Sequence, residues 1–405
     1  MKQSKHNIYY SPKEVRTILE RSIDTALDGL KGYCNDPVSD FTRCRKLPAR
    51  TLIECIMSFS NYSSIGEMSH FFEGHGKMPS ASALSQRRQL LDPDIFKRIN
   101  NLFVSAFDDH TTINGYHILA QDGSDVNIPF MDDKTKTEKH DAKSFCQYHV
   151  NALYDCLNKV FYDWSIDAAS KKREVNALIS ILKDRGYESY NLMAHFIEND
   201  IKFVIRVKDI HTKSGLMTNI KTEEGAFDMR VNRTLTSLQT KEIKADKEKY
   251  IFVPSTSNFD FLDENRDFYD LSFRAVRFKI SEDVYETVVT NLSEEEFKAE
   301  DFKELYHYRW NEETAFNKLK YTIGLVYFHA RKRKLIQQEI NAAFLMYNVS
   351  EVVIRNIDLK KNKKPELEYD YKPNFSSAVT NIRLYLRKQI SVKQKSIKTY
   401  KKRQT

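Results

Sequence analysis

The sequence has few cysteines, the residues that stabilise small proteins through disulfides or zinc sites. Its five cysteines include no Cys-x2-Cys pair and have no partner histidine at zinc-ligand spacing; they are Cys34, Cys44, Cys55, Cys146 and Cys156. A disulfide framework and a zinc site are therefore not expected. We expect reduced thiols with structural roles.

Long hydrophobic runs are also absent. The opening residues, MKQSKHNIYYSPKEV, lack the apolar segment of a signal peptide. No stretch approaches the roughly 18 uncharged apolar residues that a membrane-spanning helix requires. There is no internal repeat and no glycine-rich phosphate loop. We expect a soluble, intracellular protein that does not contact membranes.

The chain does have length, a large apolar fraction and positive charge at one end. Its 405 residues are 41% hydrophobic and 30% charged, which is enough for two or three domains with a core. The net charge is +8, yet residues 359–405 alone carry 14 Lys and Arg against 3 Asp and Glu. This basic C-terminal tail suits contact with DNA phosphates, and a solubilising, partly disordered end is the alternative.

The N-terminal part has helical patterns. Ser11 is a predicted N-cap, because Pro follows at the first helical position and Glu14 stands three residues after the cap. Apolar residues recur at helical spacing in residues 51–59 and 95–107. Residues 1–112 are therefore predicted to form a helical domain.

A short predicted helix at residues 79–91 is the candidate for DNA contact within this domain. Small residues precede Arg87 and Arg88 there, and guanidinium groups suit phosphate. An ordinary solvated helix face is the alternative.

The pattern then changes to alternating strands and helices. Residues 116–130 and 149–166 are rich in β-branched and aromatic residues, with a turn expected at 157–159. A helical pattern at 171–183 and a strand at 200–209 complete an α/β arrangement. We assign residues 113–209 to the first part of an α/β core.

The next residues, 210–292, are mostly strand-like and form an expected β-rich insertion. Within it, residues 269–280 are apolar in both phases, which indicates a bulge or a strand buried on both faces. The core resumes at 293–358.

The segment ELYHYRWNEETAFNKLKYTIGL, residues 304–325, is predicted as one helix. Tyr306, Arg309, Glu313 and Lys320 fall within an arc of about 60° on such a helix. An apolar stripe lies beside them. The alternative is an ordinary amphipathic helix with an Arg309–Glu313 ion pair.

Two aspartates precede turn-forming glycines elsewhere in the core. Asp122 follows a strand-like run, and Asp184 occurs in KDRGYES. Together with Glu313 they form a possible three-carboxylate site, which suits hard divalent cations and phosphodiester chemistry. Each aspartate taken singly is also explained as a capped turn.

The spacing Y-x2-R-x3-E-x6-K, met by Tyr306, Arg309, Glu313 and Lys320, resembles the signature of bacterial insertion-sequence transposases of the DDE class. DGSDVNIP and DRGYESYN resemble the segments that hold the first and second catalytic aspartates. The resemblance extends over residues 40–348, most of the chain.

This resemblance implies an RNase H-like core with a β-rich insertion and an N-terminal DNA-binding domain. Asp122, Asp184 and Glu313 would bind two Mg²⁺ or Mn²⁺ ions. Tyr306, Arg309 and Lys320 would hold phosphates, and Trp310 would stack on a distorted base or belong to the core. Asp125 competes with Asp122 for the first position.

The implied function is a transposase that binds terminal inverted repeats of double-stranded DNA, cleaves them and joins the 3′ hydroxyl ends to target DNA. The active form would be a homodimer on paired ends, in the bacterial cytoplasm and associated with the nucleoid. A non-catalytic DNA-binding remnant and a stand-alone RNase H-like nuclease are the alternatives.

One departure from the family pattern lies before Asp184. Only 17 residues separate it from Ile166, whereas a crossover helix followed by a parallel strand needs at least a dozen residues besides the strand. Either residues 179–182 form a shortened strand or Asp184 is displaced. We expect displacement, which would make this an internally deleted, weak or inactive copy.

Overall fold

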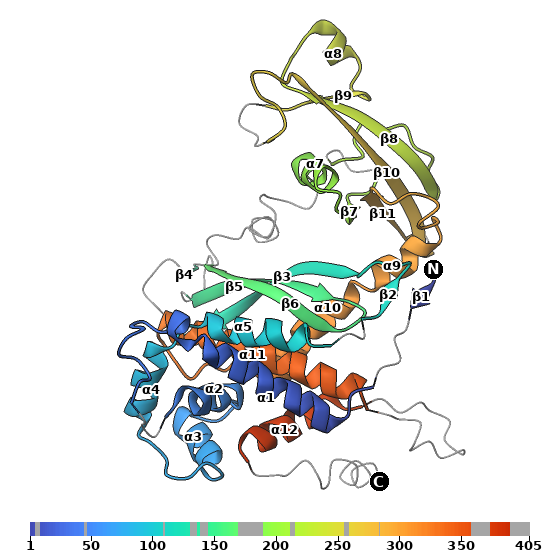
Figure 1. The fold of residues 1–405 in the computed structure, drawn as a ribbon. Coiled ribbons are helices and arrows are strands. Elements are labelled where there is room, and N and C mark those ends of the chain that lie inside the picture. Colours follow the sequence, from blue (N-terminus) through green and yellow to red (C-terminus); the bar gives the residue numbers. More distant parts are fainter. Residues whose placement is uncertain are drawn as a thin grey trace, which may run out of the picture. The chain divides into compact units, whose positions relative to one another are not determined.

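The computed structural model describes residues 1–4, 9–43, 47–107, 110–129, 136–137, 145–168, 189–210, 215–254, 259–282, 284–357 and 373–388 (Figure 1). The chain divides into two compact units. The β-rich unit comprises Met1–Gln3, Ile113–Tyr116 and Arg173–Trp310, and the helix–sheet unit comprises Ser4–Thr112, His117–Lys172 and Asn311–Thr405. Each is described by itself.

A five-stranded sheet is the centre of the β-rich unit. Its order is β7-β11-β10-β8-β9, and all pairs are antiparallel except β8 with β9. The strands are β7 (Val204–Val207), β8 (Phe227–Thr236), β9 (Tyr250–Phe252), β10 (Phe268–Ser281) and β11 (Val284–Thr290). The helices are α7 (Tyr190–Glu198), α8 (Lys241–Ala245) and α9 (Asp301–His307).

Strand β10 is buried on both faces along its middle, as one of the two sequence interpretations predicts. Phe273 and Ala275 are buried on one face, and Arg274 and Val276 on the other. The register also shifts between Lys279 and Ser281, so a bulge is present as well, near the end of the strand. Burial on both faces explains why the apolar residues of β10 follow no single phase.

The helix–sheet unit has a smaller antiparallel sheet. Strands β3 (Leu119–Ile128) and β6 (Val160–Ala168) flank β5 (Phe145–Asp155), and the short β4 (Lys136–Thr137) also pairs with β5. The predicted turn between β5 and β6 is confirmed, with Lys159 in the left-handed region at φ 58°. Among the described residues, β5 is the only strand that pairs with β3.

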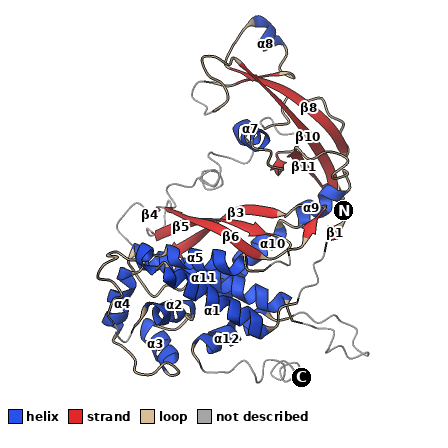
Figure 2. Cartoon of the chain, in the orientation of Figure 1, coloured by secondary structure: helices blue, strands red, loops and turns tan. Residues whose placement is uncertain are grey.

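Helices fill the rest of this unit, as the colouring in Figure 2 shows. They are α1 (Pro12–Asp28), η1 (Leu30–Tyr33), α2 (Ala49–Met57), α3 (Ser64–Phe72), α4 (Ala81–Leu90), α5 (Asp94–Val104), α10 (Trp310–Asn317), η3 (Lys318–Ile323), α11 (Arg333–Arg355) and α12 (Phe375–Leu386). The predicted capping box is confirmed: the amide of Glu14 donates to Ser11 Oγ at 3.3 Å, and the amide of Ser11 donates to Glu14 Oε2 at 2.7 Å.

Helix α11 is the packing centre of the helix–sheet unit. It contacts α1, α2, α4, α5, α12 and β6. The side chain of Asn348 brackets the backbone of Phe161 on β6, accepting from its N–H and donating to its C=O, each at 2.8 Å. Trp164 stacks on Phe344 with ring centroids 4.4 Å apart. These contacts fix α11 against one face of the sheet.

The two units do not divide where the sequence led us to expect. The helical domain predicted for residues 1–112 is present as helices α1 to α5, of which α3 had no predicted counterpart, but these helices belong to the same unit as β3, β5 and β6. Strand β7, which we expected in the core sheet, pairs with β11 in the β-rich unit. The segment before Asp184, and Asp184 itself, lie outside the described residues. Among the described helices, none is both long and apolar enough to cross a membrane.

Candidate active site

Asp122 lies in the middle of β3, opposite Ala152 of β5. Its carboxylate Oδ1 accepts a hydrogen bond from the amide of Gly123 at 2.8 Å. The residue is half-buried. Its carboxylate is therefore positioned by the strand while retaining some access to solvent.

Helix α10 is joined to β3 at this aspartate. The amide of Asp122 donates to Glu312 Oε1 at 3.0 Å, and the side chain of Glu312 is fully buried. Glu313, the signature glutamate, is the next residue and is half-buried. The hydrogen bond places α10 beside β3, so that Asp122 and Glu313 lie in the same region of the helix–sheet unit.

Sequence reasoning missed Glu312. A signal for it was present, because Glu312 shares the helical phase of Ala315, Phe316 and Leu319, which are all buried. A glutamate in the phase of an apolar stripe needs a hydrogen-bond donor when it is buried. Here that donor is the backbone amide of the predicted catalytic aspartate.

Asp125, the competitor for the first catalytic position, takes part in a different arrangement. Its Oδ1 lies 2.8 Å from Nδ1 of His149 on the neighbouring strand. Burial lowers the pKa of Lys320, and the charge of Asp125 opposes that effect, so the two groups interact electrostatically. The structure thus gives Asp125 a histidine partner and places the signature lysine near it.

Gly123, between the two aspartates, is required by close packing. A Cβ atom there would overlap with His149 Nε2 and lie 3.0 Å from Asn151 Oδ1. Any larger residue would displace these buried side chains of β5. The Asp-Gly pair is therefore a packing feature inside β3, and the turn that we expected after the aspartate is absent because β3 continues to Ile128.

The prediction that residues 304–325 form one helix is wrong. Helix α9 ends at His307, and the amide of Arg309 donates to the carbonyl of Tyr306 at 3.1 Å in a tight turn. Helix α10 then begins at Trp310, and η3 continues it as a π-helix that ends at Ile323 and is capped by Gly324 at φ 100°. A single helical arc therefore does not describe the signature residues.

The boundary between the two units falls between Trp310 and Asn311, within α10. Tyr306, Arg309 and Trp310 belong to the β-rich unit. Glu313 and Lys320 belong to the helix–sheet unit. The predicted apolar stripe is nevertheless confirmed, because its members are all buried: Leu305, Ala315, Phe316, Leu319 and Ile323.

The signature residues of the β-rich unit form a local cation–aromatic group. The Arg309 guanidinium lies 5.4 Å from the ring centres of both Tyr306 and Trp310. Burial raises the pKa of the Tyr306 hydroxyl, and the charge of Arg309 opposes this rise. Trp310 is 51% exposed, so the core alternative for this residue does not agree with the structure.

The two arginines predicted to contact DNA from α4 have internal partners. Arg88 is only 3% exposed, pairs with Glu339 at 2.8 Å and donates to the carbonyl of Leu335. Burial with α11 corrects our hypothesis for Arg88, because a phosphate cannot reach this guanidinium. Arg87 is half-buried, with its guanidinium 4.1 Å from the centre of the Phe41 ring.

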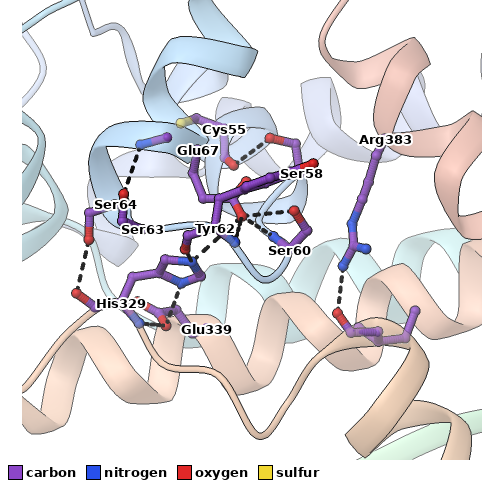
Figure 3. A network of polar contacts seen from close by, with 12 residues as sticks. Cys55, Ser58, Ser60, Tyr62, Ser63, Ser64, Glu67, His329, Glu339 and Arg383 are labelled. Atoms are coloured by element: carbon purple, nitrogen blue, oxygen red, sulfur yellow. Dashed lines mark hydrogen bonds and ion pairs between the residues drawn. The ribbon is translucent and has the colours of Figure 1, made fainter.

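Arg88 takes part in a buried group of charges that we call the His329 network: Glu67, Arg88, His329, Glu339 and Arg387. Figure 3 shows His329 between Glu67 and Glu339. His329 Nδ1 lies 3.3 Å from Glu339 Oε2, and Nε2 lies 2.9 Å from the carbonyl of Tyr62. Both ring nitrogens face acceptors, which only the protonated imidazolium can satisfy.

The pKa of His329 agrees with this geometry. Burial alone would lower it, but the hydrogen bonds to Glu339 and Glu67 raise the pKa to about 9. Burial opposes ionisation of Glu67 as well, yet its bonds to His329 and to Ser60 hold its pKa below the ordinary value. The network is thus ionised and paired at neutral pH.

Part of the basic C-terminal tail is folded into the same network. Arg387, at the end of α12, pairs with Glu67 at 2.8 Å, and Arg383 donates to the carbonyl of Ile323. These two positive charges are used inside the protein. The lysine runs at 360–364 and 401–403 lie outside the described residues.

A strand-borne aspartate next to a helix-borne glutamate agrees with the class of DDE transposases. The sequence matches the transposase DDE domain family over residues 113–349, which is more than half of the chain. The chain therefore belongs to the transposase DDE domain family.

Comparisons with solved structures and with curated proteins give no further information on the family. A cryo-EM structure of a piggyBac transposase synaptic complex with hairpin DNA is similar over 99% of this chain and 86% of that chain, at 12% identity and a TM-score of 0.43. A similarity at this level does not define a common fold. No curated protein matches the chain.

Proposed function

We propose that this protein is a DNA transposase that cleaves the ends of its element and joins the 3′ hydroxyls to target DNA. The observation that carries the proposal is the 3.0 Å hydrogen bond from the amide of Asp122 to Glu312. It holds the signature helix α10 beside the strand that bears the first aspartate. The family match over residues 113–349 supports the same function.

Asp122, Glu313 and Asp184 are the proposed ligands for two Mg²⁺ or Mn²⁺ ions. The donor set fits hard cations, since the two described members are half-buried carboxylates. Ions bound there would lower the pKa of a nucleophilic water and stabilise the leaving oxygen of the phosphodiester. Glu312 is a positioning residue, because its bond is to the backbone of Asp122.

The remaining signature residues are proposed to hold DNA. The Arg309 guanidinium and the Lys320 ammonium suit phosphate, and the Tyr306 hydroxyl can donate to it. Trp310 is exposed and offers an aromatic face on which a distorted base can stack. For Arg87 we retain the role in DNA contact as a proposal.

An RNase H-like core and a homodimer on paired DNA ends complete the proposal. The antiparallel order β3-β5 with β6 on β5 supports such a core. The site of action would be chromosomal DNA in the bacterial cytoplasm.

The position of Asp184 decides whether this copy of the transposase is weak or inactive. Isothermal titration of Mn²⁺ into wild type and Asp184→Ala tests it: a clear loss of affinity in the variant contradicts a displaced Asp184.

A cleavage assay tests the function. Wild type should nick a duplex carrying the element's own end in the presence of Mg²⁺. Glu313→Gln should lower the rate by at least about 10³-fold, since several kcal/mol of transition-state stabilisation are removed. Glu304→Gln is the matched control, because Glu304 is exposed on the preceding helix α9, and it should keep the wild-type rate.

The other outcomes select the alternatives. If wild type binds the element's end but never cuts it, the protein is a non-catalytic DNA-binding protein. If it cuts unrelated branched DNA equally well, it is a stand-alone nuclease. If Glu313→Gln cuts as fast as wild type, the proposed site is wrong.

A further inference from the structure

A further group of side chains of the types that ligate metals lies in the helix–sheet unit, apart from Asp122 and Glu313. His110, His117 and Asp155 each offer one ligand atom, and these atoms all lie within 4.8 Å of one another. His110 follows α5, His117 precedes β3, and Asp155 ends β5. Residues 45 positions apart in the chain thus converge at one end of the small sheet.

The distances are close to those of a coordinated ion. Asp155 Oδ2 lies 3.7 Å from His117 Nδ1. Two ligand atoms of a tetrahedral zinc site are about 3.3 Å apart, given bonds of about 2.0–2.1 Å. The rings of His110 and His117 meet edge to face with centroids 5.2 Å apart. The three ligand atoms, all within 4.8 Å of one another, would have to move closer together to hold one ion.

Asp155 is held in place for this role. Its side chain is fully buried. Oδ1 accepts from the amides of Leu157 and Asn158 at 3.0 and 2.7 Å, and Oδ2 accepts from Asn158 Nδ2 at 2.8 Å. Such outer hydrogen bonds orient metal ligands. Among the described residues, His117 is the ion-pair partner of Asp155.

Asn158 also positions the segment that carries His110. Its Oδ1 accepts from the amide of Thr111 at 2.9 Å, and its Nδ2 reaches the carbonyl of the same residue at 3.2 Å. The turn between β5 and β6 therefore holds both the carboxylate and the residue next to the first histidine.

We propose that His110, His117 and Asp155 bind one Zn²⁺ ion or a similar divalent transition metal. Two imidazoles favour such ions over Mg²⁺ and Ca²⁺, which prefer all-oxygen sites. His117 is 43% exposed, which leaves room for water to complete the coordination. The site needs no cysteine, which is why the expectation of no zinc site, based on cysteine spacing, did not consider it.

The site has a structural consequence. His110 and His117 stand on either side of Ile113–Tyr116, four residues that belong to the β-rich unit. An ion bound to His110, His117 and Asp155 would hold both ends of this segment at the β5–β6 turn. Its role would thus be to stabilise the segment between His110 and His117, independently of the proposed catalysis.

Metal titration of the chelator-treated full-length protein tests the proposal. Zn²⁺ should bind with one equivalent that His110→Ala and His117→Ala each weaken at least about tenfold. Co²⁺ in the same site should give a visible absorption band that both variants lose. Millimolar Mg²⁺ should not displace the ion.

Two controls make the result specific. His195 also faces an aspartate, with Nε2 2.7 Å from Asp260 Oδ2, and His195→Ala should bind Zn²⁺ like wild type. Asp122→Asn should do so too, which separates this site from the proposed active site. Because His117 is exposed, its variant should keep the wild-type circular dichroism spectrum. Zn²⁺ affinity unchanged in His117→Ala, or weakened equally in His195→Ala, overturns the proposal.

Discussion

Two groups of acidic residues in the helix–sheet unit differ in how deeply their carboxylates are buried and in which charged groups face them. In the His329 network, Glu67 and Glu339 are buried, and arginine or imidazolium groups face both. At the β3–α10 contact, Asp122 and Glu313 are only half-buried. Both groups are dense in charge, yet their surroundings differ.

This difference distinguishes carboxylates that stabilise the fold from carboxylates that can bind a ligand. A buried and fully paired carboxylate holds helices together and has no capacity left for a ligand. A half-buried carboxylate at the end of a well-ordered contact can exchange water for a substrate or an ion. Charge density alone therefore does not identify an active site. The degree of burial and the identity of the partners do.

The largest expected effect on stability comes from neutralising Glu67. Glu67→Gln leaves Arg387 without its buried counter-charge and removes one of the two carboxylates beside His329, so unfolding free energy should fall by about 3–5 kcal/mol. Urea denaturation followed by circular dichroism measures it. Glu73→Gln, an exposed change at the end of the same helix α3, should stay within about 0.5 kcal/mol. Equal stability of the two variants would remove the distinction drawn above.

The His329 network also predicts a loss of stability at alkaline pH. The folded-state pKa of about 9 exceeds the ordinary value near 6.5, so the contribution is complete below about pH 6.5 and disappears as pH rises through 9. Wild type should lose up to about 3 kcal/mol across this window. Unfolding free energies measured at pH 6 and pH 9.5 should differ far less in His329→Gln. An unchanged pH dependence in that variant would assign the loss to other groups.

Gly123 belongs to the β3–α10 group but is a packing feature, because an added methyl group there would meet buried side chains of β5. Gly123→Ala should cost about 1–3 kcal/mol, since the new methyl group overlaps with His149. It should also displace β3 near Asp122 and slow DNA cleavage. Thermal denaturation and the nicking assay measure the two effects. Gly32→Ala, where no atom lies within 4 Å of the added methyl, is the control and should change neither.

The smallest expected effect on stability belongs to the proposed catalytic aspartate. Asp122→Asn retains an oxygen that can accept from the amide of Gly123, and the charge it removes is half-exposed. Unfolding free energy should change by less than about 1 kcal/mol, while cleavage should be lost. A destabilisation as large as that of Glu67→Gln would show that Asp122 is structural.

Features that depend on neighbouring residues were predictable from the sequence. The capping box at Ser11 and the turn between β5 and β6 are set by residues within a few positions of each other. The apolar stripe of the signature segment was also predictable, because burial follows helical phase. The family resemblance, confirmed over residues 113–349, identified Asp122 and Glu313 as candidates.

Features that depend on distant partners were not predictable. Arg88 looks like a DNA-contacting residue on a short helix, but its partner Glu339 is 251 residues away. The sequence has no glycine or proline at the break after α9, so no local signal predicts that the helix ends there. It coincides with a change of unit near Trp310, which local spacing cannot reveal. The roles of Glu312 and of Asp155 depend in the same way on contacts between elements.

The central position of α11 has a consequence for synthesis of the chain. Helices α1 to α5 end at Val104, whereas α11, against which α1, α2, α4 and α5 pack, begins at Arg333. A ribosome adding about 5–20 residues per second needs roughly 10–50 s to cover that distance. During this interval the apolar faces of the first helices lack their native partner. The helix–sheet unit therefore cannot complete its packing until α11 has been synthesised.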